Sequence, residues 1–279
     1  MKKACVIGWP VAHSRSPLIH NYWLKHYGLE GLYEKKAVKP EELQHFLQTM
    51  QELGYVGCNV TIPHKEEALR AVSHVDEVVK RTGSLNTIYF VANEKHATST
   101  DGEGFFRNLV TTIPGLDLPD KKAIIIGAGG SAKAIIERLL RAGLSDIAVQ
   151  NRTLERVDEL KAAFGPQIRA IDATHFVAES KTAALVVNTT SQGMKGQPSL
   201  DIDLSALPVD CVVADLVYVP LETDLLRQAH ARGLRTVGGL GMLLHQAVDG
   251  FEKWFGVRPQ VTSQLYDHVA ADILKEYQA

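Results

Sequence analysis

Short apolar, β-branched runs alternate with stretches of helical periodicity along the first third of the chain. The pattern predicts strands over residues 3–7, 32–38, 56–61 and 86–91, and helices over 17–27, 41–53 and from 63 onward. Such alternation is typical of α/β folds with largely parallel sheets. We therefore expect one open sheet with crossover helices in this part of the chain.

A turn-rich stretch, residues 111–120, separates this part from a second series, whose strands are predicted over residues 123–126, 147–150, 168–171, 185–188, 212–215 and 235–237. Six strands with helical segments between most of them match a doubly wound nucleotide-binding sheet. Residues 241–279 are mostly helical, so we expect them to pack back on the first domain. The predicted fold class is α/β, with an open α/β domain from residues 1–101 and 240–279 and an inserted Rossmann-like doubly wound domain from 102–239.

Composition supports this division and removes some partners. At ~150 residues per domain, 279 residues leave room for about two domains. The net charge is −2 and the pI is about 6.6. Nucleic-acid binding and polybasic membrane binding call for a strong positive excess, so neither partner is expected.

The cysteines and the apolar runs bear on the compartment. Cys5, Cys58 and Cys211 lie far apart without a C-x-x-C pair, which predicts neither a disulfide framework nor a zinc cage and fits a reducing cytoplasm. The apolar run at residues 4–7 is too short for a signal peptide, and no stretch approaches the ~18 residues of a membrane span. The histidines include no H-E-x-x-H motif, so no metal is expected.

A glycine-rich turn follows the strand predicted at residues 123–126 and precedes a helix. It reads Gly127-Ala128-Gly129-Gly130-Ser131-Ala132, a G-x-G-x-x-A pattern. Glycines let the backbone turn tightly and approach a pyrophosphate, which then sits at the positive N-terminus of the helix. A purely structural turn is the alternative, but the strand, the helix and the six-strand series favour a dinucleotide.

The next predicted strand ends at Gln150, where a site for NAD would carry an acidic residue. This chain has Asn151-Arg152-Thr153 instead, with Arg156 further on. Two guanidinium groups and a hydroxyl suit a 2′-phosphate, so NADP is predicted over NAD. The alternative is a solvated helix start.

Two further strings indicate an anion site and a proton-transfer group. Ser14-Arg15-Ser16-Pro17 precedes the first helix. Ser16 suits the N-cap, and Ser14, not needed for capping, makes a carboxylate site plausible. In residues 59–65, alternation gives Asn59 and Thr61 the same facing, and Pro63 is expected to open a helix with Lys65 in its first turn.

A helix dipole disfavours a cation at that end, which favours proton transfer by Lys65 over the commoner fate of an exposed lysine. Asp101 begins another helix, where it is either an N-cap or the acid partner of Lys65.

Together these strings resemble the shikimate dehydrogenase family over nearly the whole chain. Their order and spacing are specific: Ser14-x-Ser16-Pro17, Asn59-Val60-Thr61-Ile62-Pro63-x-Lys65, Asn86-Thr87, Thr100-Asp101-Gly102, Gly127-Ala128-Gly129-Gly130, Asn151-Arg152-Thr153, Asn188-Thr189-Thr190-Ser191-Gln192-Gly193-Met194, Asp215-Leu216-Val217-Tyr218-x-Pro220 and Gly239-Leu240-Gly241-Met242-Leu243-x-x-Gln246.

The resemblance implies NADPH-dependent reduction of 3-dehydroshikimate to shikimate, on the route to chorismate and aromatic amino acids. It makes Lys65 and Asp101 the proton-transfer pair. It implies substrate contacts from Ser14, Ser16, Asn59, Thr61, Asn86, Asp101, Tyr218 and Gln246. It implies NADP(H) contacts from Gly127, Ala128, Gly129, Gly130, Ser131, Asn151, Arg152, Thr153, Arg156, Thr190, Leu216 and Gly239.

Two departures from the family pattern are small. Ser99 stands where the family often has Asn, and Thr189 where Ala is usual. Three alternatives stay open: a quinate/shikimate dehydrogenase of broader specificity, a non-catalytic relative that senses shikimate or quinate, and a Rossmann dehydrogenase for an unrelated small acid. We expect a cytoplasmic monomer or homodimer whose partners are small molecules.

Overall fold

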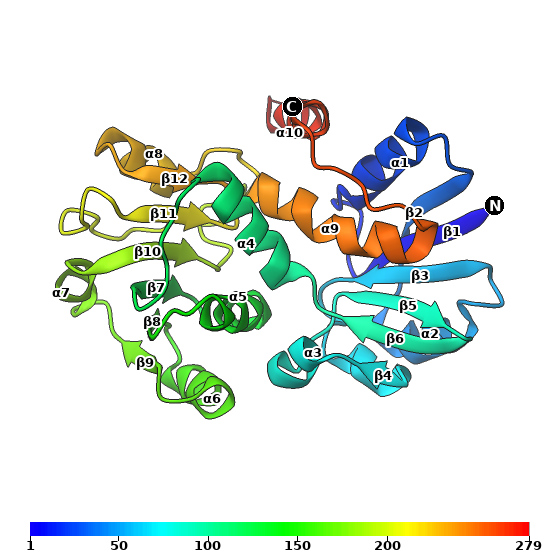
Figure 1. The fold of residues 1–279 in the computed structure, drawn as a ribbon, viewed down its shortest axis with the longest axis horizontal. Coiled ribbons are helices and arrows are strands. Elements are labelled where there is room, and N and C mark those ends of the chain that lie inside the picture. The colour runs from blue at the N-terminus through cyan, green and yellow to red at the C-terminus, as the bar shows by residue number, and fades with distance from the viewer. Residues whose placement is uncertain (279) are drawn as a thin grey trace. The chain divides into compact units, whose positions relative to one another are not determined.

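The structure, a computed structural model, describes residues 1–278 and divides into two compact units (Figure 1). The first unit comprises Met1–Asp101 and Gln246–Val269. The second comprises Gly102–His245 and the chain from Ala270 onward. Both are α/β units, as the alternating pattern predicts, and each contains one six-stranded sheet.

The sheet of the first unit has the strand order β2-β1-β3-β5-β6-β4. Its strands are β1 (Lys2–Gly8), β2 (Gly31–Ala37), β3 (Tyr55–Val60), β4 (His74–Val75), β5 (Thr87–Val91) and β6 (Glu94–Thr98). β1 runs parallel to β2 and β3, whereas β5 is antiparallel to both β3 and β6. β4 runs parallel to β6, so three of the five strand pairs are parallel. The expectation of parallel strands with crossover helices holds for β1, β2 and β3, whereas the antiparallel β5 was not expected.

The antiparallel pair arises from a hairpin. Ala92 and Asn93, which connect β5 to β6, both have positive φ, as the tight two-residue turns of hairpins require. The chain therefore reverses directly, without a crossover helix.

Helical segments cover both faces of this sheet. They are α1 (Ser16–His26), η1 (Pro40–Glu42), α2 (Leu43–Thr49), η2 (Glu67–Ala71) and α3 (Glu77–Thr82). Apolar residues of α2, η2 and α3 form one core with Cys5 and Ile7 of β1. On the opposite face, rings of α1 and of α9 (Gly239–Phe255) pack together, with Trp23 lying 5.3 Å from Phe251 between ring centroids.

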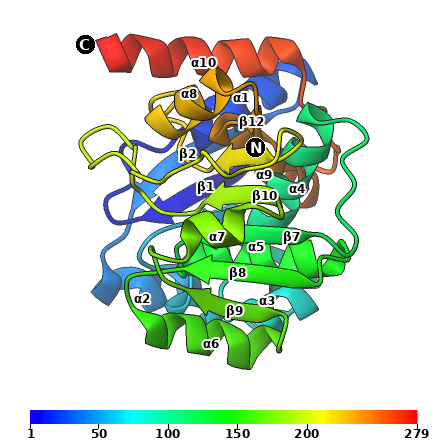
Figure 2. The ribbon, with the colours of Figure 1, turned by 90° about the vertical axis from the view of Figure 1, so that its left-hand side faces the viewer.

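The sheet of the second unit is entirely parallel, in the order β12-β11-β10-β7-β8-β9 (Figure 1). Figure 2 shows β7, β8 and β9 side by side. Its strands are β7 (Lys122–Ile126), β8 (Asp146–Gln150), β9 (Ile168–Ile171), β10 (Ala183–Asn188), β11 (Val212–Asp215) and β12 (Arg235–Val237). Read from β9, this is the doubly wound order 3-2-1-4-5-6. The Rossmann-like prediction is confirmed.

Both faces of this second sheet are buried, which explains the uninterrupted apolar strands. Along β7, Ala123 and Ile125 belong to one core, whereas Ile124 and Ile126 belong to the other. The first core includes α4 (Asp101–Thr112), α5 (Gly130–Arg141) and α6 (Leu154–Phe164), and the second includes α7 (Phe176–Ser180) and α8 (Asp224–Ala231).

The last two helices, α9 and α10 (Ser263–Gln278), each contribute residues to both units. Residues 246–269 group with the first unit, and residues 240–245 and those from 270 onward with the second. Across the described residues, every helix is too short or too polar to span a bilayer.

Candidate active site

Lys65 and Asp101 form an ion pair in the first unit. Lys65 Nζ donates to Asp101 Oδ2 at 2.5 Å, and the two side chains are 22% and 14% exposed. Asn86 Nδ2 donates to the other carboxylate oxygen, Oδ1, at 2.8 Å. The carboxylate is thus held at both oxygens, while the amine keeps some access to solvent. A proton-transfer site needs such a group, fixed in place and reachable by a substrate.

The orientation of the Asn86 amide is fixed by its neighbours. Its side-chain oxygen accepts from the Thr100 amide at 2.9 Å and from the Thr87 hydroxyl at 2.8 Å. A flipped amide would point its NH₂ group at the Thr100 N–H, so one orientation alone satisfies the network. Asn86, only 4% exposed, therefore positions Asp101 and through it Lys65.

The helix expected from Pro63 is absent, and the dipole argument for Lys65 is therefore wrong. The His64 amide donates to the Thr61 carbonyl at 2.9 Å, and the Ile62–Pro63 peptide is cis. The chain turns here, and the next helical segment is the 3₁₀ helix η2. Lys65 is held instead by its own carbonyl, which accepts from the Leu85 amide at 3.1 Å.

His64 is a positioning residue that the sequence did not reveal. Its ring is 1% exposed, and Nε2 lies 2.8 Å from the Val38 carbonyl oxygen. This contact anchors the turn that carries Lys65. A lone histidine beside a proline carries no pattern that distinguishes it from an exposed one.

Asn59 ties three strands together beneath the ion pair. Its side-chain oxygen accepts from the Tyr33 hydroxyl at 2.6 Å. Its NH₂ group donates to the Asn86 carbonyl and to the Thr87 hydroxyl, both at 3.1 Å. These contacts use the amide within the protein, and direct contact of Asn59 with a ligand stays a prediction. Thr61 is half-buried, and a Cβ on Gly8 would lie 2.5 Å from its Cγ2.

Ser14 and Ser16 lie together at the start of α1. Ser14 Oγ donates to Ser16 Oγ and also accepts from the Ser16 amide, each at 3.3 Å. The N-cap is Arg15, without a side-chain capping bond, so the expectation of a capping Ser16 is wrong. Arg15 is already in a helical conformation, which begins the helix one residue early.

The remaining predicted substrate contacts lie on two different elements. Gln246 is a half-buried residue of α9 in the first unit. Tyr218 is half-buried in the segment after β11 in the second unit.

The glycine turn lies at the carboxyl end of β7, an inner strand beside which the strand order of the second sheet reverses. Gly127 has a φ of +104°, and a Cβ there would lie 2.7 Å from Thr189 Oγ1. Gly129 is the N-cap of α5, and a Cβ on it would meet no atom within 4 Å. The tight packing at Gly127 and the open space at Gly129 fit a pyrophosphate at the helix N-terminus. Ala128 is buried, and Gly130 and Ser131 begin α5.

The segment after β8 presents its charges to solvent. Arg152, Thr153 and Arg156 are exposed, and Asn151 Nδ2 donates to the Thr153 carbonyl at 2.7 Å. The Thr153 side chain makes no capping bond to α6. The two exposed guanidinium groups, beside the turn that Asn151 closes, fit a phosphate on the adenosine ribose.

Thr190 lies in the segment after β10, and Leu216 directly follows β11. Gly239 is the first residue of α9. A Cβ on Gly239 would lie 2.1 Å from the Leu216 carbonyl oxygen, so glycine permits this close approach. Thr190 donates from its hydroxyl to Asn188 Oδ1 at 2.7 Å.

A buried acid that the sequence did not assign to the site shapes the loops after β10 and β11. Asp215 is 2% exposed; its Oδ1 accepts from Asn188 at 2.9 Å and from the Val217 amide at 3.0 Å. Its Oδ2 accepts from the Thr223 hydroxyl at 2.7 Å. Burial raises the pKa of this carboxyl, against the opposing effect of these donors. The signal in the sequence that could have revealed Asp215 is an acidic residue at the end of an apolar strand.

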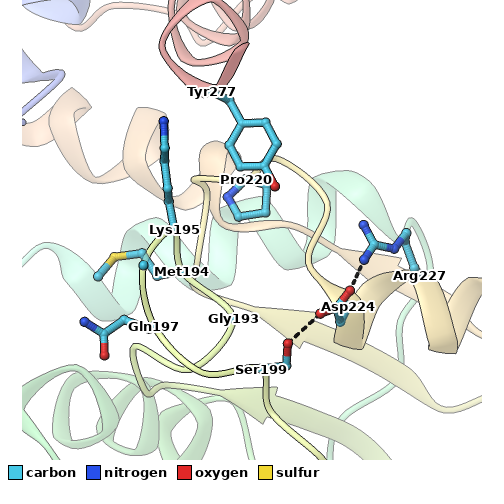
Figure 3. A pocket seen from close by; sticks show the side chains of 10 residues that line it. Gly193, Met194, Lys195, Gln197, Ser199, Pro220, Asp224, Arg227 and Tyr277 are labelled. Carbon is cyan, nitrogen blue, oxygen red and sulfur yellow. Dashed lines mark hydrogen bonds and ion pairs between the residues drawn. The ribbon is translucent and has the colours of Figure 1, made fainter. Parts of the chain in front are cut away.

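A pocket of about 510 Å³ lies beside the loop after β10 (Figure 3). Asp224 pairs with Arg227 and accepts from the Ser199 hydroxyl at 2.6 Å, and Lys195 Nζ lies 5.6 Å from the Tyr277 ring centroid. None of the predicted site residues lines this pocket. It is therefore separate from the predicted site.

Comparison of the sequence with known families gives three matches. Residues 6–88 match the family described as shikimate dehydrogenase substrate binding domain. Residues 108–195 match shikimate / quinate 5-dehydrogenase, and residues 239–263 match the shikimate 5′-dehydrogenase C-terminal domain.

Curated and solved relatives cover almost the whole chain. A protein of Rhodopseudomonas palustris (strain TIE-1) named shikimate dehydrogenase (NADP(+)) is 53% identical over 98% of this chain and 97% of its own length. The structure of shikimate 5-dehydrogenase from Thermus thermophilus with NADP(H) and shikimate is 34% identical, with a TM-score of 0.86 over 98% of this chain and all of that one. Quinate dehydrogenase from Corynebacterium glutamicum with NAD is 28% identical, with a TM-score of 0.89 over 97% of this chain and all of that one.

Proposed function

Because the chain belongs to the shikimate dehydrogenase family, we propose that it catalyses the reversible NADPH-dependent reduction of 3-dehydroshikimate to shikimate. This makes it an oxidoreductase acting on a CH–OH group in chorismate and aromatic amino acid biosynthesis. The NADP(H) prediction is confirmed by relatives named for NADP(+). Sequence alone thus identified the family, the fold class and the cofactor.

The observation that carries the proposal is the Lys65–Asp101 pair held by Asn86. When bound, NADPH supplies the hydride that the carbonyl carbon of the substrate accepts. Lys65 Nζ delivers a proton to the carbonyl oxygen as the hydroxyl forms, and takes that proton back in the reverse direction. Asp101 orients the amine and balances its charge.

The substrate contacts are proposed from the family resemblance. Ser14 and Ser16 bind the carboxylate, since both hydroxyls lie at the N-terminus of α1, where the helix dipole also favours an anion. Thr61, Asn86, Tyr218 and Gln246 bind the ring hydroxyls. Asn59 acts through Asn86 and Thr87, whose positions its amide fixes.

The cofactor contacts are proposed from the second unit. The pyrophosphate lies over the turn of Gly127, Ala128, Gly129, Gly130 and Ser131, where a Cβ on Gly129 would enter open space. Asn151, Arg152, Thr153 and Arg156 hold the 2′-phosphate. Thr190 contacts the cofactor, and Leu216 and Gly239 contact it near the nicotinamide. Asn188 and Asp215 hold the loops that carry Thr190 and Leu216.

We also propose which domain binds which ligand, the compartment and the oligomeric state. The proposed substrate-binding domain comprises residues 1–101 and 240–279, and the proposed NADP-binding domain comprises residues 102–239. In the structure, residues 240–245 and those from 270 onward group with the second unit instead. The protein acts as a cytoplasmic monomer or homodimer on small molecules. Light scattering coupled to gel filtration measures the oligomeric state.

Replacing Lys65 tests the proposed role. We expect Lys65→Ala to lower kcat for shikimate oxidation by ~10²–10⁴-fold, the usual cost of losing a positioned acid–base group, with a far smaller change in KM. Lys25→Ala, at an exposed position near the end of α1, is the matched control and should keep wild-type kinetics. Nearly unchanged turnover in Lys65→Ala excludes Lys65 as the proton carrier.

A further inference from the structure

Three side chains with metal-binding atoms meet at the edge of the first unit's sheet. His74 belongs to the edge strand β4, and Glu94 and His96 belong to β6 (Figure 1). His74 is the register partner of His96, and Glu94 shares the face of His96 because it lies two residues before it. One ligand atom from each of the three lies within 4.8 Å of the other two.

The contacts within this cluster already orient its members. His74 Nε2 lies 2.8 Å from Glu94 Oε2. The two imidazole rings stack with their centroids 4.4 Å apart, and the Tyr89 ring lies 5.6 Å from His96 on its other neighbouring strand. The histidines and the carboxylate are therefore gathered by strand pairing, with no role in the Lys65 site.

This donor set suits zinc. Zn²⁺ takes imidazole nitrogen and carboxylate oxygen at about 2.0–2.2 Å, and a site with three protein ligands leaves a fourth tetrahedral position for water. Ligand atoms in such a shell lie roughly 3.4 Å apart. His74 and Glu94 side chains are 50% and 62% exposed, so both are free to rotate over the remaining distance.

We propose that His74, Glu94 and His96 form a Zn²⁺-binding site with water as the fourth ligand. Both imidazoles bind as neutral rings, and His74 gives up its hydrogen bond to Glu94 in exchange for the metal. The ion links β4 to β6. Because β4 has two residues and pairs with β6 alone, the link stabilises the sheet edge.

Calorimetric titration of the untagged, chelator-treated protein with ZnCl₂ tests this site. We expect one Zn²⁺ per chain, and a rise in Tm on binding. Loss of an outer partner of a ligand typically costs ~10–100-fold in metal affinity, so His74→Gln and His96→Gln should each lose at least about tenfold. Neither variant should alter the far-ultraviolet circular dichroism, since His74 is exposed and His96 is half-buried near the sheet edge.

The matched control is His175→Gln. His175 is also exposed and its Nδ1 lies 2.8 Å from a carboxylate oxygen of Asp172, but in the described part of the chain no third metal-binding side chain joins that pair. The control should bind Zn²⁺ as the wild type does. Absence of saturable binding in the wild type, wild-type affinity in either His74→Gln or His96→Gln, or an equal loss in His175→Gln overturns the proposal.

Discussion

Single buried side chains decide where the reactive groups of the first unit stand. Asn86 and Asn59 are 4% and 6% exposed, and the contacts of their amides restrain neighbouring strands, Thr100 and Asp101. Burying an amide group costs free energy unless it is hydrogen-bonded. The side chains of Asn86 and Asn59 are therefore restricted to the orientation in which these hydrogen bonds form. The sequence predicted Asn86 and Asn59 as site residues, but no sequence spacing could show that Asn59 acts within the network.

The buried polar residue His20 has a different consequence. Its ring stacks on Tyr33 at 4.0 Å between centroids and is fully buried among Trp23, Phe251 and Trp254. Burial lowers the pKa of His20 from 6.5 to about 3. The folded protein therefore holds this ring neutral over a range where the unfolded chain binds a proton.

We predict that this residue makes the protein sensitive to acid. Between pH 6.5 and about 3, proton uptake by the unfolded state lowers the free energy of unfolding by up to ~1.4 kcal/mol per pH unit. Urea unfolding at several pH values should show a flatter dependence in His20→Phe than in the wild type. His26→Gln, at an exposed position on the same helix, should keep the wild-type slope. Identical slopes for His20→Phe and the wild type would remove His20 as the cause.

At the scale of elements, prediction succeeded where burial imposes a simple pattern. The inner strands β7, β10 and β11 of the second unit are covered on both faces, so each reads as a nearly continuous apolar run. β6, with the sequence EKHAT, has one solvent face and was missed, as was the two-residue β4. The turn at Ala92 and Asn93 contains no glycine, and the turn after Thr61 depends on the buried His64. Such tertiary contacts leave no local signal.

Arg152, in the segment between β8 and α6, is predicted to determine the preference for NADP⁺ over NAD⁺. We expect Arg152→Ala to raise KM for NADP⁺ by roughly ten- to a hundredfold, because a hydrogen bond to a charged group contributes about 1.5–3 kcal/mol. KM for NAD⁺, which lacks the 2′-phosphate, should stay unchanged. Lys161→Ala, exposed near the other end of α6, serves as the control in the same steady-state assay. An equal rise for both cofactors would assign Arg152 to the shared part of the dinucleotide.

At the scale of the whole molecule, each unit is proposed to supply most of the contacts to one ligand. Hydrogen exchange followed by mass spectrometry should then give two separate footprints. Shikimate alone should protect residues 14–16, 59–65 and 86–87, and NADP⁺ alone should protect 127–131 and 151–156. Protection of 59–65 by NADP⁺ alone would contradict this assignment of ligands to units.

The central claim concerns the reaction itself, and the rate of NADP⁺ reduction by the wild-type protein with shikimate tests it most directly. Following the absorbance of NADPH, we predict turnover with shikimate, with kcat/KM at least about tenfold above that with quinate and above that with NAD⁺ as cofactor. Preference for quinate and NAD⁺ would indicate the quinate-oxidising alternative. No absorbance rise with either acid and either cofactor would contradict the account and favour a non-catalytic relative.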